Sequence, residues 1–152
     1  MLEDLYEIHN EIMSTTPKSR KRYLYSKVNW ESSGLCITGD RGVGKTTMIC
    51  QDLVERYQTP SRALYISADH IKVLSLGLVN IAKHHFEMGG EALYIDEVHK
   101  YPNWSIEIKN ILDTYKGRQI VFSASSSLDL NQSKGDLSRR VVYHKMQGFS
   151  FR

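Results

Sequence analysis

The segment from Gly39 to Thr46 constrains this chain more than any other part of its sequence. Its residues, GDRGVGKT, fit the pattern G-x-x-x-x-G-K-[ST]. The apolar run LCIT precedes the segment and an amphipathic stretch follows it, which is the strand, loop and helix order that the pattern requires. A glycine-rich loop at a helix N-terminus predicts a phosphate-binding site within an α/β fold.

The residue types of this segment suit a nucleotide. Glycine lets the backbone adopt turns that strain other residues, so successive N–H groups can point at phosphate oxygens. The Lys45 ammonium is expected at the β- and γ-phosphates, and the Thr46 hydroxyl is expected to bind Mg²⁺. We expect the Asp40 and Arg41 side chains to be exposed at the loop tip. The candidate ATP-binding residues are Gly39, Asp40, Arg41, Gly42, Val43, Gly44, Lys45, Thr46 and Thr47.

Short apolar runs alternate with longer amphipathic stretches along the chain. An amphipathic helix is expected at the N-terminus and should end at Pro17. The other predicted helices are roughly Thr46 to Tyr57, Ser75 to Met88 and Trp104 to Tyr115. The predicted strands are LCIT, ALYIS, ALYID, QIVFSA and VVYHKM. This alternation predicts an α/β fold in which a mainly parallel five-stranded sheet has helices on both faces, and together with the phosphate loop it predicts the three-layer P-loop NTPase sandwich.

A chain of 152 residues with 41% hydrophobic content is expected to form one domain. We expect residues 1–33 to supply the N-terminal helix and a basic entry segment before the nucleotide-binding core. Cys36 and Cys50 form no CxxC pair, which indicates reduced, buried thiols and a cytoplasmic location. The sequence has no signal peptide pattern and no apolar run of membrane-spanning length, so no membrane partner is expected.

Two carboxylates follow the apolar run ALYI. Asp96 and Glu97 are expected at the carboxyl end of this strand, the edge where open α/β sheets bind ligands. Asp96 is predicted to hold Mg²⁺, directly or through water, and Glu97 to orient or deprotonate an attacking water. Without the phosphate loop, Asp96 and Glu97 could simply be acidic residues at the start of a helix, where such residues are common. Together with the loop, the pair indicates hydrolysis of ATP.

The strand QIVFSA ends in serines, of which Ser123 and Ser125 are candidate catalytic residues. If this strand lies between the loop strand and the Asp96 strand, a serine hydroxyl is expected to help position the water. A serine-rich turn that merely ends the strand remains open. Arg139 and Arg140 are candidates for a positive charge that acts on the phosphoryl group of a neighbouring subunit, and surface salt bridges remain open for both.

Several longer strings resemble one family, the prokaryotic AAA-type ATPases that carry a poorly characterised C-terminal domain. The similarity extends from about Tyr23 to the last residue. It rests on RGVGKTT, LYIDEVHKYPNW, SSSLDL, DLSRR and GFSFR. The strings DEVHKYPNW and DLSRR are more specific to this family than the phosphate loop. Two positions depart from the family pattern, because Asp40 stands where proline is frequent and Ala124 where glycine is common.

The resemblance implies more than the residues show by themselves. It implies the strand order 5-1-4-3-2, a nucleotide site at the phosphate loop, Mg²⁺ and water handling by Asp96 and Glu97, and a polar sensor within Ser123 to Ser126. It further implies a chain truncated before a helical lid and a C-terminal domain. Members of such folds work as homo-oligomers or as switches controlled by a protein partner.

Two other functions remain open. Asp96 to His99 also spell the DExH motif of nucleic-acid helicases, but the interval from Lys45 to Asp96 is short for a helicase domain. The net charge of +3 and pI of about 8.8 do not indicate a nucleic-acid partner. In the second alternative, the chain is a nucleotide-gated switch with slow hydrolysis.

Overall fold

The computed structural model describes residues 2–17, 23–40, 44–125, 137 and 139–146. Its helices are α1 (Glu3–Thr15), η1 (Tyr23–Lys27), α2 (Lys45–Arg56), α3 (Ile71–Leu76), α4 (Leu78–Glu87), η2 (Val98–Lys100) and α5 (Trp104–Thr114). Its strands are β1 (Gly34–Gly39), β2 (Ala63–Ser67), β3 (Ala92–Asp96), β4 (Gln119–Ser125) and β5 (Val142–Met146). None of the described helices has the length and apolar character needed to cross a membrane.

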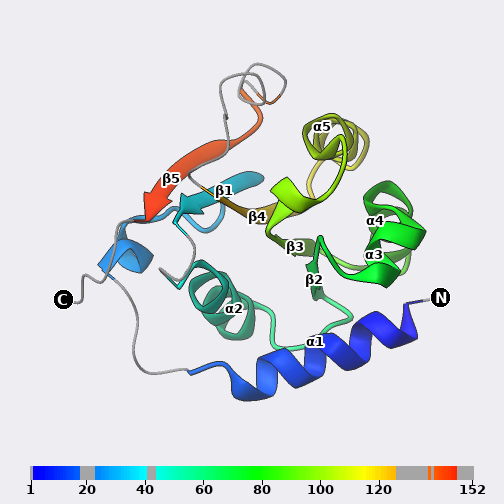
Figure 1. Ribbon diagram of the computed structural model, residues 1–152, viewed down its shortest axis with the longest axis horizontal. Coiled ribbons are helices and arrows are strands. Elements are labelled where there is room, and N and C mark those ends of the chain that lie inside the picture. Colours follow the sequence, from blue (N-terminus) through cyan, green and yellow to red (C-terminus); the bar gives the residue numbers. More distant parts are fainter. Residues whose placement is uncertain (1, 18–22, 41–43, 126–136, 138, 147–152) are drawn as a thin grey trace.

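The five strands form one parallel sheet in the order β2-β3-β4-β1-β5 (Figure 1). The predicted P-loop NTPase sandwich and the strand order implied by the family resemblance are therefore confirmed. β4 lies between β1 and β3, so the strand that ends in the candidate serines is central. All five carboxyl ends point to the same edge because the strands are parallel.

Helices cover both faces of the sheet, and residues of one strand alternate between two cores. On β3, Leu93 and Ile95 pack with α3, α4 and α5, whereas Tyr94 packs with α2 and Trp30 on the other face. Figure 1 shows α2 on the side of the sheet opposite α4 and α5. Successive side chains of a strand point to opposite faces, so an almost wholly apolar strand such as ALYI fits a sheet that is buried on both sides.

The helix predicted from Ser75 to Met88 is wrong in one respect, because the structure has two helices there. α3 ends at Leu76 and α4 begins at Leu78, with Gly77 between them at φ +89°. Glycine adopts this conformation without the strain that a Cβ would bring. The Tyr101 hydroxyl accepts a hydrogen bond of 3.1 Å from the Leu78 N–H and so caps the new helix start. The break therefore combines a glycine within the predicted helix with a contact from a tyrosine distant in the sequence.

Helix α1 lies against the edge strand β2 (Figure 1). It ends at Thr15, and Thr16 is extended, as expected for a residue near Pro17. His9 is 1% exposed, and its Nδ1 accepts a hydrogen bond of 2.9 Å from the Tyr65 backbone N–H. Burial, and to a lesser extent the charge of His85, lowers the pKa of His9 to about 4. The helix thus covers the sheet edge and satisfies one of its backbone donors through a neutral imidazole.

We expect the protein to lose stability as the pH falls from 7.5 to 4.5, partly through His9. Its pKa in the folded protein lies below the unfolded value of about 6.5, so the unfolded chain binds the proton more readily and the stabilisation disappears as the pH falls through this range. The contribution is roughly 2–3 kcal/mol between these pH values. Urea unfolding at both pH values measures it. His9→Asn keeps an acceptor but cannot titrate, so its free energy of unfolding should decrease less between pH 7.5 and 4.5. An identical decrease in both proteins would contradict the role assigned to His9. Buried His85, whose pKa is also lowered by burial, titrates in the same direction in both proteins.

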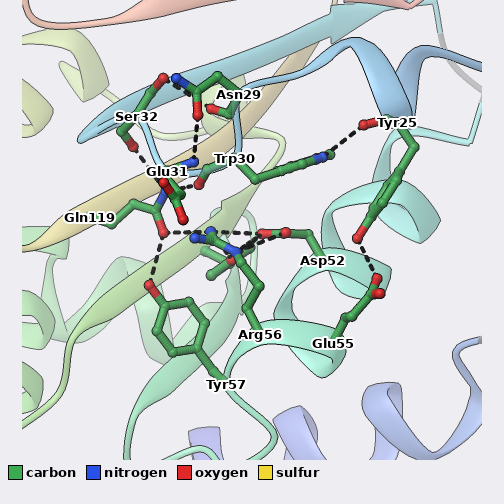
Figure 2. A network of polar contacts seen from close by, with 11 residues as sticks. Tyr25, Asn29, Trp30, Glu31, Ser32, Asp52, Glu55, Arg56, Tyr57 and Gln119 are labelled. Atoms are coloured by element: carbon green, nitrogen blue, oxygen red, sulfur yellow. Dashed lines mark hydrogen bonds and ion pairs between the residues drawn. The ribbon is translucent and has the colours of Figure 1, made fainter.

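A polar network crosses the amino-end edge of the sheet (Figure 2). Arg56, at the end of α2, donates to both carboxylate oxygens of buried Asp52 at 2.9–3.1 Å. It also donates to the Tyr94 hydroxyl at 3.0 Å and to Oε1 of Gln119 at 2.7 Å. The amide of Gln119 in turn donates to the carbonyls of Trp30 and Ser32. The network therefore ties α2 to β3, to β4 and to the segment before β1.

Candidate functional site

The predicted phosphate loop connects β1 to α2 at the carboxyl-end edge of the sheet. β1 ends at Gly39, and α2 begins at Lys45 after Gly44, whose φ of +94° is suited to glycine. Asp40 is exposed, as the sequence predicts. Thr46 and Thr47 lie in the first turn of α2, where backbone N–H groups and the helix dipole favour an anion. The predicted ligands Arg41, Gly42 and Val43 lie outside the described residues.

The Lys45 side chain lies against the end of β1 and is 7% exposed. Its Nζ donates to the carbonyl oxygen of Gly39 at 2.8 Å and to that of Asp40 at 3.1 Å. Burial lowers the pKa of Lys45, while the charges of Asp96, Glu97 and Asp40 oppose this shift. The ammonium is therefore held at the end of β1, near both candidate carboxylates.

Asp96 is the meeting point of three elements. Its Oδ2 accepts hydrogen bonds from the Thr46 hydroxyl at 2.6 Å and from the Tyr65 hydroxyl at 2.8 Å. Its Oδ1 accepts from the Ser123 hydroxyl at 2.5 Å. The carboxylate is 5% exposed, and it lies against α2, β2 and β4 at once. The structure thus brings together two residues that the sequence predicted for Mg²⁺, Thr46 and Asp96.

Glu97 has left-handed backbone geometry, with φ 55° and ψ 52°. Such a conformation is uncommon outside glycine and asparagine, and it marks positions that the surrounding structure holds in place. The Glu97 N–H donates to the Ser123 hydroxyl at 2.8 Å. The side chain is 29% exposed, and its Oε2 lies 3.1 Å from the Lys100 ammonium. Glu97 is therefore the more accessible of the two carboxylates, as a group that contacts water must be.

The two candidate serines differ in their surroundings. Ser123 is fully buried, donates to Asp96 and accepts from Glu97, so its hydroxyl links the two carboxylate residues. Ser125 is half-buried, and its backbone N–H donates to Nδ1 of His99 at 3.2 Å. Burial lowers the pKa of His99. A direct contact between either serine and water stays a prediction, and Ser126 and Ser127 lie outside the described residues.

Arg139 and Arg140 lie at the opposite edge of the sheet. They precede β5, whose first residue Val142 pairs with the beginning of β1. Arg140 forms an exposed ion pair with Asp113 at 2.7 Å, and both arginines line an open hollow of about 550 Å³. They are therefore remote from Lys45 of their own chain, and the surface salt bridge that the sequence left open is formed by Arg140.

The oxygen donors at the site fit a magnesium ion. Mg²⁺ prefers oxygen ligands and usually keeps several waters, so one or two protein groups suffice to hold it. The Thr46 hydroxyl and the Asp96 carboxylate lie side by side, with 2.6 Å between Oγ1 and Oδ2, so one cation and its bound waters can reach both groups. Within the described ranges, no three or more His, Cys, Asp or Glu side chains form a group that could hold a metal.

Sequence reasoning missed two residues of this site, Tyr65 and Lys100. Both reach a carboxylate through the fold. Lys100 is three residues from Glu97, so helical spacing could have suggested the pair. Tyr65 lies on another strand, and only the strand order and register bring it to Asp96.

Known proteins resemble this chain in sequence and in fold. A family model described as an AAA domain matches residues 31–152. An uncharacterized protein of Methanocaldococcus jannaschii is 31% identical over 161 residues, covering 93% of this chain and 33% of that protein. The chain thus spans about a third of the length of this curated relative.

Two solved structures are similar at low sequence identity. A DNA replication initiation factor superposes with a TM-score of 0.52 at 17% identity, over 92% of this chain and 46% of that chain. AMPPCP-bound DnaA from Aquifex aeolicus has a TM-score of 0.49 at 18% identity, over 93% of this chain and 45% of that chain. The likeness to the initiation factor is one of fold. The family match, in contrast, covers the phosphate loop, both carboxylates and most of the sequence, and the chain therefore belongs to the AAA domain family.

Proposed function

We propose that this chain is an AAA-type ATPase core that binds ATP and hydrolyses it with Mg²⁺, driving or gating a conformational change. The observation that carries the proposal is the contact between the two predicted halves of the site. Thr46 of the phosphate loop and Asp96 of β3 are far apart in sequence, yet their side-chain oxygens are 2.6 Å apart. A glycine-rich loop alone could bind many anions. A loop joined to a buried carboxylate indicates a metal-bound nucleotide.

Each residue has a role in this proposal. The backbone N–H groups at the start of α2 and the Lys45 ammonium bind the phosphates. Thr46 and Asp96 hold Mg²⁺, which supplies positive charge to the phosphate oxygens when it is bound. Glu97 orients the attacking water and accepts its proton, because its side chain is accessible next to the buried Asp96. The Ser123 hydroxyl fixes the positions of Asp96 and Glu97 relative to each other, because it forms a hydrogen bond with each of them.

A neighbouring subunit completes the site in this proposal. Arg139 and Arg140 lie at the edge opposite the phosphate loop, so if either acts on a phosphoryl group, that group belongs to the nucleotide of another copy. An arginine supplied in this way is worth about 10³–10⁵ in rate in other nucleotide hydrolases. ATPase assays with and without RNA or DNA would separate this function from that of a helicase.

Lys45→Ala should weaken ATP binding strongly. Loss of the ammonium leaves several phosphate oxygens poorly compensated, at a cost of roughly 2–5 kcal/mol by analogy with close charge pairs, or ~30- to 5,000-fold in affinity. Isothermal titration in the presence of Mg²⁺ measures this loss. Lys45→Met keeps most of the buried stem and should bind equally poorly, which separates the charge from the packing.

The matched control is Lys72→Ala, which removes an exposed lysine of α3 that pairs with Asp4. It should bind ATP as the parental protein does. Parental affinity in folded Lys45→Ala and Lys45→Met proteins would refute the proposed function.

A further inference from the structure

Tyr65 contacts the proposed magnesium ligand from a strand that carries no recognised motif. Its hydroxyl donates to Oδ2 of Asp96 at 2.8 Å, and the two residues are 4% and 5% exposed. Tyr65 pairs with Tyr94 in the register of β2 and β3, so Asp96 lies two residues further along the neighbouring strand on the same face. A tyrosine is long enough to span such a diagonal.

The oxygen that Tyr65 contacts is the one that also accepts from Thr46. An ionised carboxylate has about four acceptor positions, and protein hydroxyls use three of those of Asp96. The side chain is therefore held from three directions, while one electron pair can be offered to a cation. Groups that hold a metal ligand in this way set the orientation and the affinity of the site.

We propose that Tyr65 is a positioning residue for Asp96, which holds its carboxylate in the orientation that binds Mg²⁺. This inference rests on the proposed function. It assigns a role to the edge strand β2 and, through it, to helix α1. The Tyr65 backbone N–H is bound by buried His9, and the Ala68 N–H after β2 donates to the Asp96 carbonyl at 2.9 Å. The backbone groups of Tyr65 and Asp96 are thus both held by hydrogen bonds, one from a side chain and one from the backbone.

The same sheet provides a matched control for this role. Tyr94 lies beside Tyr65 on the same face and is also buried. Its hydroxyl likewise donates to a buried carboxylate, Oδ2 of Asp52. That contact belongs to the network at the amino-end edge, where the Arg56 side chain binds the same carboxylate. Tyr65→Phe and Tyr94→Phe therefore make the same chemical change, one near the proposed magnesium site and one at the amino-end edge of the sheet.

The test compares Tyr65→Phe with Tyr94→Phe in a titration of Mg²⁺ at a constant concentration of a fluorescent, non-hydrolysable ATP analogue. Tyr65→Phe should raise the half-saturating Mg²⁺ concentration by about tenfold or more, the usual effect of losing a partner of a metal ligand. Its affinity for the analogue in EDTA should stay near the parental value. Tyr94→Phe should leave both quantities unchanged. Thermal unfolding should show a folded protein in both cases, with a lowered midpoint.

Each outcome decides the question. A parental Mg²⁺ curve for Tyr65→Phe, or an equal shift for Tyr94→Phe, would overturn the role of Tyr65 while leaving metal-dependent binding of the parental protein intact. Failure of the parental protein itself to bind the analogue more tightly with Mg²⁺ would instead defeat the proposed function, and the inference with it.

Discussion

Glu97→Gln should retain binding of ATP and Mg²⁺ while hydrolysis falls by about 10²–10⁴, the range typical of a general base. The amide has the size and hydrogen-bonding capacity of the carboxylate but cannot accept the proton of the attacking water. The backbone of Glu97 is held by the hydrogen bond from its N–H to Ser123, so the substitution should not disturb the end of β3. The ion pair with Lys100 would be lost, but it is partly exposed and contributes little.

Binding and single-turnover hydrolysis should be measured side by side with Asp96→Asn. That variant weakens the magnesium site, so both metal-dependent nucleotide binding and turnover should decrease. Glu91→Gln serves as the matched control, because Glu91 is an exposed carboxylate that pairs with Arg62 at the other edge. It should behave as the parental protein does. Hydrolysis at the parental rate in Glu97→Gln would show that Glu97 is only a helix-start residue, and the mechanism would be wrong.

Arg56→Ala should lower the free energy of unfolding by about 3 kcal/mol, the lower end of the usual cost of breaking a buried ion pair, because Asp52 is buried but the Arg56 side chain is 25% exposed. Asp52 is 1% exposed, and burial already raises its pKa, while Arg56 and Tyr94 counteract that shift. Without Arg56 the buried Asp52 carboxylate loses the cation that binds it, and Gln119 loses a donor. The network in Figure 2 would therefore lose its centre.

Urea unfolding measures this loss against a control on the same surface. Arg62→Ala also removes an arginine from an ion pair, but Arg62 and Glu91 are 49% and 48% exposed, so the expected cost is at most about 1 kcal/mol. The double variant Asp52→Leu/Arg56→Met should recover much of the lost stability, since a buried pair can be replaced by apolar groups. If Arg56→Ala cost no more than Arg62→Ala, the network would be shown to contribute nothing beyond a surface salt bridge.

The sequence by itself determined the parts of this protein that depend on neighbouring residues. The phosphate loop was recognisable because a strand, a glycine pattern and a helix follow one another without interruption, and the structure has β1 and α2 at these positions. The parallel sheet was predictable because β1, β2, β3 and β4 are mainly apolar and buried along their length. Asp96 and Glu97 could be placed at the ligand-binding edge because they follow an apolar run directly. Residues at the end of a strand lie at the carboxyl edge of a parallel sheet, where ligands bind.

Only the tertiary structure decided which distant side chains meet. The contact of Tyr65 with Asp96 requires that β2 lie beside β3 in one particular register, and a shift by one residue would turn Tyr65 to the other face. The Leu78 N–H at the start of α4 is likewise capped by the Tyr101 hydroxyl, which reaches it from outside the helix. Local patterns arise from the geometry of consecutive residues. Contacts between strands depend on packing, strand order and register, and no short segment of the sequence encodes these.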